Sequence, residues 1–484
     1  MTALVAPLPL LLVIALLASG RAGALGAGLA GLGATAALAF LLAAPAAGGA
    51  AAIVALAREM PAGLWLAWPV VAIIVSGMFF HRATLARPRA PAPEAGPGQA
   101  TPRRLWSLCF LLAPFAESVT GFGVGYVIAL AALRAQGIGG LPALLLGLFS
   151  QSLVPWGALA AGTTVGAALA AMPAAELGFR TALVQAPIHA LYLLLYWRFA
   201  RAAGVVVPTA GKLEDLAWTA LLIALVALAN RTADPEIAGA APCALLLALR
   251  YWRDERPDRQ RLAQALHAVA PYAVLVAALC ATRLIGPLRQ GLLSIAPLTP
   301  LPDLPTFAPL YAPGTWVIGV GIGVALAARA SLARLTVETA RSAWRACAVT
   351  VVFLLMARLY QSTGLADAIA GELRAHGDAF AALGVPPLAA LGGFLTGSAA
   401  AASAMLMPME LALAREVGMD AGWMAAVQTA VSANLSMLSP MRVSMGTAIL
   451  GMAAAERELY RRAWPLALPP IAAGTAVLSL LALS

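Results

Sequence analysis

The stretch Glu117-Ser118-Val119-Thr120-Gly121-Phe122-Gly123 interrupts a long apolar segment, residues 105–135, with a carboxyl group, hydroxyls and glycines. A second apolar segment, residues 385–415, is interrupted by Thr396-Gly397-Ser398. An uninterrupted helix facing lipid would not need such residues, and irregular backbone at membrane depth is tolerated only where protein or water covers it. We therefore predict two re-entrant helical hairpins whose broken tips are buried in protein.

The composition places the chain in a lipid bilayer. Of its 484 residues, 62% are hydrophobic and 11% are charged, whereas an average soluble domain carries roughly a quarter charged residues. This balance excludes a soluble enzyme, a nucleic-acid-binding protein and a disordered chain. The net charge of +10 comes from arginines at the ends of apolar runs, where basic residues hold loops in the cytoplasm.

Apolar runs predict an all-α polytopic membrane protein with about 12–14 membrane segments. Arginine-rich loops near 81–104, 250–261 and 329–345 are expected in the cytoplasm, and the proline-rich loop 286–314 outside. Apart from the two hairpins, the predicted spans lie near residues 3–19, 22–43, 61–80, 141–161, 182–200, 213–233, 236–250, 264–285, 316–330, 344–362, 421–455 and 463–482, with a short amphipathic piece at 49–58.

The two hairpin segments resemble each other. Leu133-Arg134-Ala135-Gln136-Gly137 parallels Ala414-Arg415-Glu416-Val417-Gly418, and the same offset maps two further spans of the first half onto spans of the second. Because the hairpins are expected to enter from opposite sides, this predicts an inverted-repeat secondary transporter. Its parts are a first repeat at 1–200 with hairpin 105–135, connecting segments at 201–285, and a second repeat at 286–484 with hairpin 385–415.

Two broken helices that meet near the midplane would present backbone N–H groups and positive dipole ends to an anion. The alternative is that small residues only allow close helix packing. We favour an anion site for the paired clusters. The candidate residues are Ser118, Thr120, Gly121 and Gly123 at the first tip, and Thr396, Gly397, Ser398 and Ser403 at the second.

Two acidic residues lie within the hairpins. Glu117 is deep in an apolar segment, where a charge costs at least ~2.5 kcal/mol, so it is a candidate carrier of a coupling proton. The alternative is a fixed ion pair with an arginine. Glu410, in Met-Leu-Met-Pro-Met-Glu-Leu, is the matching carboxyl group of the second hairpin, and structural and proton-coupling roles are equally plausible for it.

Each hairpin is followed by a polar cluster next to a proline, which breaks the helical hydrogen-bond ladder. In the first, Gln151 and Ser152 precede Pro155; in the second, Asn434 precedes the pair Ser439-Pro440. Both clusters predict discontinuous helices, and Gln151, Ser152, Asn434 and Ser439 are further candidate substrate-binding residues. Arg442 would then place a cation beside the second break, where it could bind a substrate carboxylate or neutralise Glu117.

At these residues the sequence resembles the bacterial L-lactate permease family, which is related to elevator-type transporters. The first similar stretch is Phe115-Ala-Glu117-Ser-Val-Thr-Gly121-Phe122-Gly123. The others are Gly393-Phe394-Leu395-Thr396-Gly397-Ser398, Leu438-Ser439-Pro440, Thr447-Ala-Ile-Leu-Gly451, Glu456-Arg-Glu458-Leu459 and Gln361-Ser-Thr-Gly364-Leu365. The resemblance implies uptake of lactate or glycolate with protons across the bacterial cytoplasmic membrane. Analogy with elevator transporters implies a moving domain, a scaffold and a homodimer.

The sequence departs from the family pattern at its polar positions. Ala399-Ala400-Ala401-Ala402 stands where the family has Asp and often Asn, and Met441-Arg442 stands where it has Gln-Ser. Gln151-Ser152-Leu153-Val154-Pro155 replaces the family's Asn-Thr-Ala-Pro. The site is therefore more positive by about two charges, which makes a different or more anionic substrate plausible.

We thus expect a permease for a small organic anion, most plausibly a lactate-like monocarboxylate with proton symport. The alternatives are a divergent exporter, or a sodium-coupled carrier of another carboxylate or a sulfonate. No ATPase, hydrolase or zinc motif occurs in the sequence, so we expect no enzyme activity, cofactor, metal or nucleic-acid partner. A membrane enzyme and a channel are the competing classes.

Overall fold

The computed structural model describes residues 2–87, 100–301 and 304–482. Within these ranges the chain folds into helices, and the β-structure is an isolated antiparallel bridge between Leu298 and Phe307. Half of the predicted loop 81–104, residues 88–99, lies outside the described residues. The all-α prediction is confirmed.

The described chain has seven helices long and apolar enough to cross a membrane, or up to eight if a bent pair counts as one span. The protein is therefore a multi-pass membrane protein. The count is below the predicted 12–14 because several predicted segments are divided into shorter helices or are themselves short. Three such helices are α2 (Leu8–Ala18), α7 (Val124–Ala135) and α16 (Pro313–Ala327).

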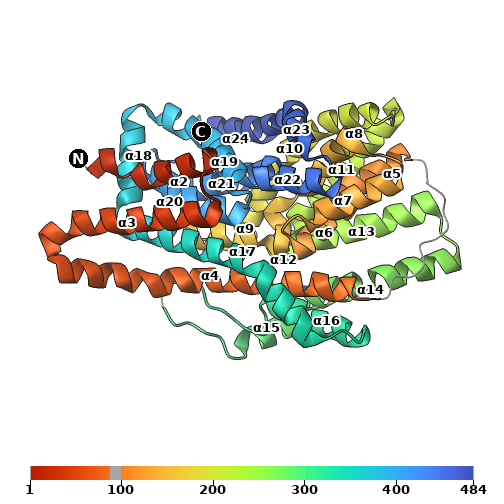
Figure 1. Cartoon of the computed structure of the whole chain (residues 1–484), viewed down its shortest axis with the longest axis horizontal. Coiled ribbons are helices and arrows are strands. Elements are labelled where there is room, and N and C mark those ends of the chain that lie inside the picture. The colour runs from red at the N-terminus through yellow and green to blue at the C-terminus, as the bar shows by residue number, and fades with distance from the viewer. Residues whose placement is uncertain (1, 88–99, 302–303, 483–484) are drawn as a thin grey trace.

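Two long helices, α4 (Gly49–Leu85) and α17 (Leu332–Ser362), lie side by side and antiparallel (Figure 1). They approach closely at Gly63, where a Cβ atom would lie 2.7 Å from Leu355 Cδ2. Ion pairs tie them together towards both ends, at Arg82–Glu338 (3.1 Å) and Glu59–Arg358 (2.7 Å). The helix α3 (Ala24–Ala47) packs against both.

Both long helices correct the sequence-based boundaries. The predicted separate piece 49–58 and span 61–80 form one helix, because α4 continues through Pro61 and Pro69; neighbouring helices can support a proline within a membrane helix. The predicted loop 329–345 is mostly helical. Its start is capped by Ser331, whose side chain accepts a hydrogen bond from the Arg334 backbone N–H.

The first interrupted segment forms two packed helical arms. The first arm consists of α5 (Pro102–Ser107), a π-helical turn η1 (Leu108–Leu112) and α6 (Ala113–Thr120), and α7 returns after a turn at 121–123. The span that follows is broken: α8 (Gly140–Gly147) and η2 (Leu148–Gln151) make an angle of 56° with η3 (Val154–Trp156) and α9 (Gly157–Leu169). The long helix α10 (Ala174–Ala202) completes this half.

The second interrupted segment repeats this order. Its arms are α19 (Asp378–Thr396) and α20 (Ala399–Glu416), which pack together around a turn at Gly397 and Ser398. The next span is again broken, between η5 (Ser436–Leu438) and Pro440, as the proline predicts. The elements that follow are α21 (Ala421–Leu435) before the break, and α22 (Pro440–Ile449), η6 (Ala453–Ala455), α23 (Glu456–Ala463), η7 (Trp464–Ala467) and α24 (Leu468–Ala482) after it.

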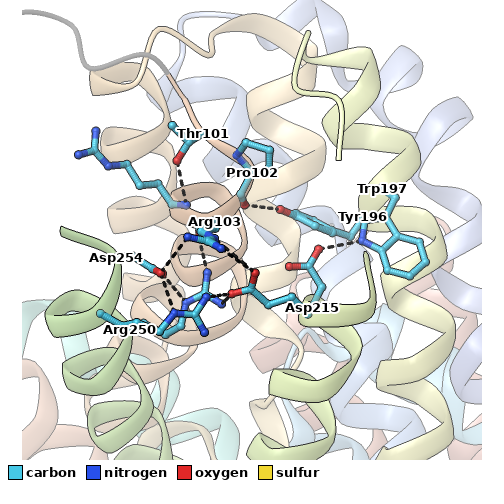
Figure 2. Close-up of polar contacts among 11 residues, drawn as sticks. Thr101, Pro102, Arg103, Tyr196, Trp197, Asp215, Arg250 and Asp254 are labelled. Carbon is cyan, nitrogen blue, oxygen red and sulfur yellow. Dashed lines mark hydrogen bonds and ion pairs between the residues drawn. The ribbon is translucent and has the colours of Figure 1, made fainter. Parts of the chain in front are cut away.

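The connecting region contributes a buried ion-pair network at the start of the first hairpin (Figure 2). Arg250 is 1% exposed and lies at the end of α13 (Ala240–Arg250). It donates from Nη1 to Glu214 (3.2 Å) and from Nη2 to the Arg103 carbonyl (3.2 Å), and its Nε lies 2.7 Å from Asp254. The network ties α5 to α11 (Thr209–Thr232) and to the π-helical turn η4 (Tyr251–Glu255).

The remaining helices complete the connections. The loop predicted at 286–314 contains the helix α15 (Gly286–Ser294). The other described elements are α1 (Thr2–Val5), α12 (Pro235–Ala238), α14 (Arg259–Leu284) and α18 (Leu365–Ala375).

Candidate substrate-binding site

A cavity of about 780 Å³ lies where the two hairpin tips and the two broken spans face α3, α4 and α17. Gly121 and Phe122 come from the first tip, and Thr396, Gly397 and Ser398 from the second. The predicted clusters at the two tips therefore share one cavity. Its charged wall residues are Glu117, Arg345 and Arg442, which sum to one positive charge.

Glu117 and Arg442 form a buried ion pair across the molecule. Arg442 Nη2 lies 3.3 Å from Glu117 Oε1, and the two residues are 4% and 2% exposed. Glu117 also accepts backbone hydrogen bonds from Gly123 to Oε1 and from Gly125 to Oε2, both at 3.0 Å. The carboxylate of Glu117 thus accepts hydrogen bonds from N–H groups at the start of α7. These are the N–H groups that we expected to bind the substrate.

Gly123 allows this pair to form. Its φ is +85°, a left-handed conformation that glycine adopts without steric cost. A Cβ atom at this position would lie 2.3 Å from Arg442 Nη1. The absence of a side chain therefore allows both the turn and the approach of the guanidinium group.

Arg442 has donors left over for a ligand. Its Nη1 and Nε atoms are buried and have no hydrogen-bond partner within the described protein. An unpaired buried donor is costly, and a guanidinium presents its donors in a fork that matches a carboxylate. Arg442 therefore has donors for an anion in the cavity, which would compete with Glu117 for the guanidinium.

The second hairpin tip faces the same cavity with a helix N-terminus. Ala399 and Ala400, the first residues of α20, line the cavity, and the first N–H groups of a helix have no partner within that helix. Ser398 caps the helix by accepting from the Ala401 N–H at 3.3 Å. Gly397 packs against Ser439, which caps α22 by accepting from the Arg442 N–H. This tip thus adds a positive dipole end near the guanidinium.

The backbone around the cavity is strained. Phe122, at the first tip, has a φ of +55°, and Ala158, Leu159 and Ala160 follow one another in the left-handed region after the first break. Each such residue costs roughly 1–2 kcal/mol. Phe122 and Ala158 both line the cavity. Backbone strain of this kind is found more often at ligand-binding sites than elsewhere in proteins.

Three predicted site residues lie in a separate buried cluster. Asn434 and Gln185 exchange side-chain hydrogen bonds at 2.9 and 3.4 Å, and Gln185 Nε2 also donates to the Ser152 carbonyl. Gln151 donates to Ser150 at 3.1 Å. Gln151, Ser152 and Asn434 are fully buried and do not line the cavity. They join the two broken spans to α10, away from this cavity.

Three hydroxyl residues of the hairpins also lie away from the cavity. Ser118 faces Gly239, where a Cβ atom would lie 2.4 Å from its Oγ. Thr120 donates to the Ala116 carbonyl at 2.6 Å, and Ser403 is fully buried in α20. Helical periodicity turns these side chains from the tips into the packing between helices.

Glu410 is buried like Glu117 but lacks the partners that hold Glu117. Its side chain is fully buried in α20, and neither carboxyl oxygen has a hydrogen-bond partner within the described protein. It does not line the cavity. An ionised carboxylate without a partner is very costly in a protein interior, so Glu410 is expected to be uncharged in this conformation.

Phe122 and Arg345 are two of the wall residues that the sequence analysis did not predict. Phe122 lies between Gly121 and Gly123, and this position in the first tip could have indicated that it lines the site. Arg345 was assigned to a loop, but it lies on α17 with its guanidinium 5.4 Å from the Trp344 ring centroid. Its position one residue inside the predicted span 344–362 could have indicated that Arg345 lies on a membrane helix.

No curated protein matches the chain. The region that matches a family model contains α17, the second hairpin, the second break and Arg442, whereas Glu117 and the first hairpin lie outside it. Residues 295–481 match the profile of the L-lactate permease family, the family that the sequence motifs resemble.

Proposed function

We propose that the protein is a secondary transporter that carries a small, lactate- or glycolate-like monocarboxylate with a proton across the bacterial cytoplasmic membrane. The observation that supports it best is Arg442, which is buried at the wall of a 780 Å³ cavity and has two nitrogens without a partner. The match of residues 295–481 to the L-lactate permease family supports the same class of substrate.

The Glu117–Arg442 pair supplies a route for coupling the anion to a proton. A substrate carboxylate that binds Arg442 would compete with Glu117, 3.3 Å from Arg442 Nη2, for the same guanidinium. Glu117 then loses its counter-charge, and an unpaired ionised carboxylate within a membrane costs at least ~2.5 kcal/mol. Glu117 therefore takes up a proton when the anion binds. One anion and one proton move together without net charge.

The cavity wall also suggests how access could alternate. On one side lie the long helices α3, α4 and α17, and on the other the hairpin tips and broken spans. We propose that the second group moves against the first, with inverted repeats at 1–200 and 286–484 joined by 201–285. A homodimer formed through the long helices would hold them fixed.

Sodium coupling is less well supported than proton coupling. Sodium needs oxygen ligands, but the Glu117 carboxylate is surrounded by two N–H donors and a guanidinium. Uptake driven by a sodium gradient at equal pH on both sides would favour the sodium-coupled alternative.

Counterflow in proteoliposomes tests the proposed function. Vesicles loaded with unlabelled L-lactate should transiently accumulate labelled lactate above equilibrium, and the accumulation should disappear in the variant Arg442→Gln. Flux that never saturates would indicate a channel, and no flux with any carboxylate would overturn the proposal.

A further inference from the structure

The cavity is large for the substrate that the family suggests. Its volume of about 780 Å³ lies within the range of roughly 300–1,000 Å³ that is usual for drug-sized ligands. A lactate ion is far smaller than such molecules. Either water fills the rest of the cavity, or the natural substrate is larger.

The polar groups of the cavity are unevenly distributed. Arg442, Thr396, Ser398 and the start of α20 lie at the hairpin tips and the second break, and α17 adds Ser342, Arg345 and Thr350. The wall formed by α3 and α4 is entirely apolar among its lining residues, which include Leu25, Leu29, Val70, Ile74 and Met78. A ligand in this cavity would meet donors for an anion at the tips and on α17, and hydrocarbon along α3 and α4.

This apolar wall lies outside the part of the chain that matches the family. The match covers residues 295–481, which include Arg442 and the second tip, whereas α3 and α4 precede it. The carboxylate-binding end thus belongs to the matched region, and the apolar end is contributed by the unmatched half. The carboxylate-binding end can therefore resemble that of a lactate carrier while the apolar end accepts a different tail.

We infer that the substrate is an amphiphilic monocarboxylate, with a carboxylate at Arg442 and an apolar tail of several carbons along α3 and α4. This inference rests on the proposed function and specifies, among monocarboxylates, an acid with a longer chain than lactate. Water in an apolar cavity lacks the polar partners that it needs, so a hydrocarbon tail is the better occupant of this wall. Each methylene group buried there should raise affinity about fourfold.

A chain-length series tests the inference on the full-length protein in nanodiscs. Straight-chain 2-hydroxycarboxylates from lactate to 2-hydroxyoctanoate are titrated as inhibitors of labelled lactate binding. Inhibition constants should fall about three- to fivefold with each added carbon until the cavity is filled. The corresponding primary alcohols should not compete, because they lack the group that Arg442 recognises.

A matched pair of variants on α17 locates the tail. Ala346 lines the cavity, whereas Ala348, on the same helix and also half-buried, does not. Ala346→Leu should weaken binding of the longest acids at least tenfold and leave lactate within twofold. Ala348→Leu should leave the whole series unchanged. If both variants leave the series unchanged, the tail does not lie in this cavity and the inference fails.

The possible outcomes separate the inference from the proposed function. If lactate is carried but affinity is flat or falls with chain length, the inference is overturned and the proposed function stands. If no acid of any length binds or is carried, the proposed function itself is wrong. Equal binding of long acids to Arg442→Gln would indicate partitioning into lipid and would also overturn the inference.

Discussion

Two buried arginines, Arg250 and Arg442, have very different surroundings. Arg250 is 1% exposed; it contacts two acidic side chains and a backbone carbonyl and lies over the rings of Trp106 and Trp218 at 5.2 and 5.3 Å. Arg442 is 4% exposed and contacts one acidic side chain through one nitrogen. Both Nη atoms of Arg250 donate hydrogen bonds and its Nε lies 2.7 Å from Asp254, whereas Nη1 and Nε of Arg442 have no partner within the described protein and Arg442 lines a cavity.

This difference separates a structural cation from a binding cation. A buried charge held by several partners fixes the elements that supply them, here α5, α11 and η4. A buried charge with unused donors gains stability when a ligand supplies the missing acceptors. Burial alone does not distinguish the two roles, but the number of occupied donors does.

The largest expected effect is the loss of transport in Arg442→Gln. We expect counterflow to fall at least 100-fold, because the variant removes the cation for the substrate carboxylate and leaves Glu117 without its partner. The double variant Glu117→Gln/Arg442→Gln should recover thermal stability relative to Arg442→Gln but no transport. Recovery of transport in the double variant would contradict a binding role for Arg442.

Arg250→Gln should have the opposite effect to Arg442→Gln, because it should reduce stability and leave transport nearly unchanged. Breaking a buried ion pair by removing one partner costs roughly 3–5 kcal/mol, so we expect a large fall in melting temperature. Transport per folded molecule should stay within about threefold. The matched control is Arg253→Gln, in the same network but with 42% of its side chain exposed, for which we expect less than about 1 kcal/mol.

Glu117→Gln tests the coupling rather than the binding. The variant leaves Arg442 free of its intramolecular competitor, so substrate binding should persist or tighten by up to about tenfold. Uptake should no longer be stimulated by an inward proton gradient. The measurement is labelled lactate uptake with and without that gradient; pH dependence like that of the wild type would exclude Glu117 as the proton carrier.

The sequence alone predicted the elements of this site better than its contacts. The two interrupted segments and the breaks at Pro155 and Pro440 follow from local chemistry, because glycine and proline disrupt a helix wherever it lies. Which hydroxyls face the cavity depends on the rotation of each helix about its axis. That rotation is fixed by packing, which is why Ser118, Thr120 and Ser403, although close to the tips in sequence, do not line this cavity.

The pairing of Glu117 with Arg442 is the clearest case of what sequence could not decide. Both an ion pair and a free proton carrier were compatible with a lone glutamate in an apolar run. The two residues belong to different halves of the chain, and their contact requires the first tip to meet the second break. A single sequence contains no measure of that distance.

Gly123→Ala should weaken the binding cation without removing any charge. The new Cβ would lie 2.3 Å from Arg442 Nη1, and the φ of +85° strains any other residue. We expect counterflow to fall about tenfold. Gly137→Ala is the matched control, because its φ is +79° but nothing lies within 4 Å of the new Cβ. An equal loss of transport in both variants would mean that backbone strain, not displacement of Arg442, causes the defect.

The smallest effect is expected from Glu410→Met, which extends the comparison to the second carboxyl group. Glu410 is fully buried and has no hydrogen-bond partner among the described residues, so an apolar side chain of similar length removes a desolvation cost and no contact. We expect thermal stability to be unchanged or to rise by about 1 kcal/mol, with proton-driven uptake intact. If the variant instead loses its response to the proton gradient while Glu117→Gln keeps it, the coupling proton resides on Glu410. The Glu117–Arg442 pair would then be fixed in the same way as the Arg250 network.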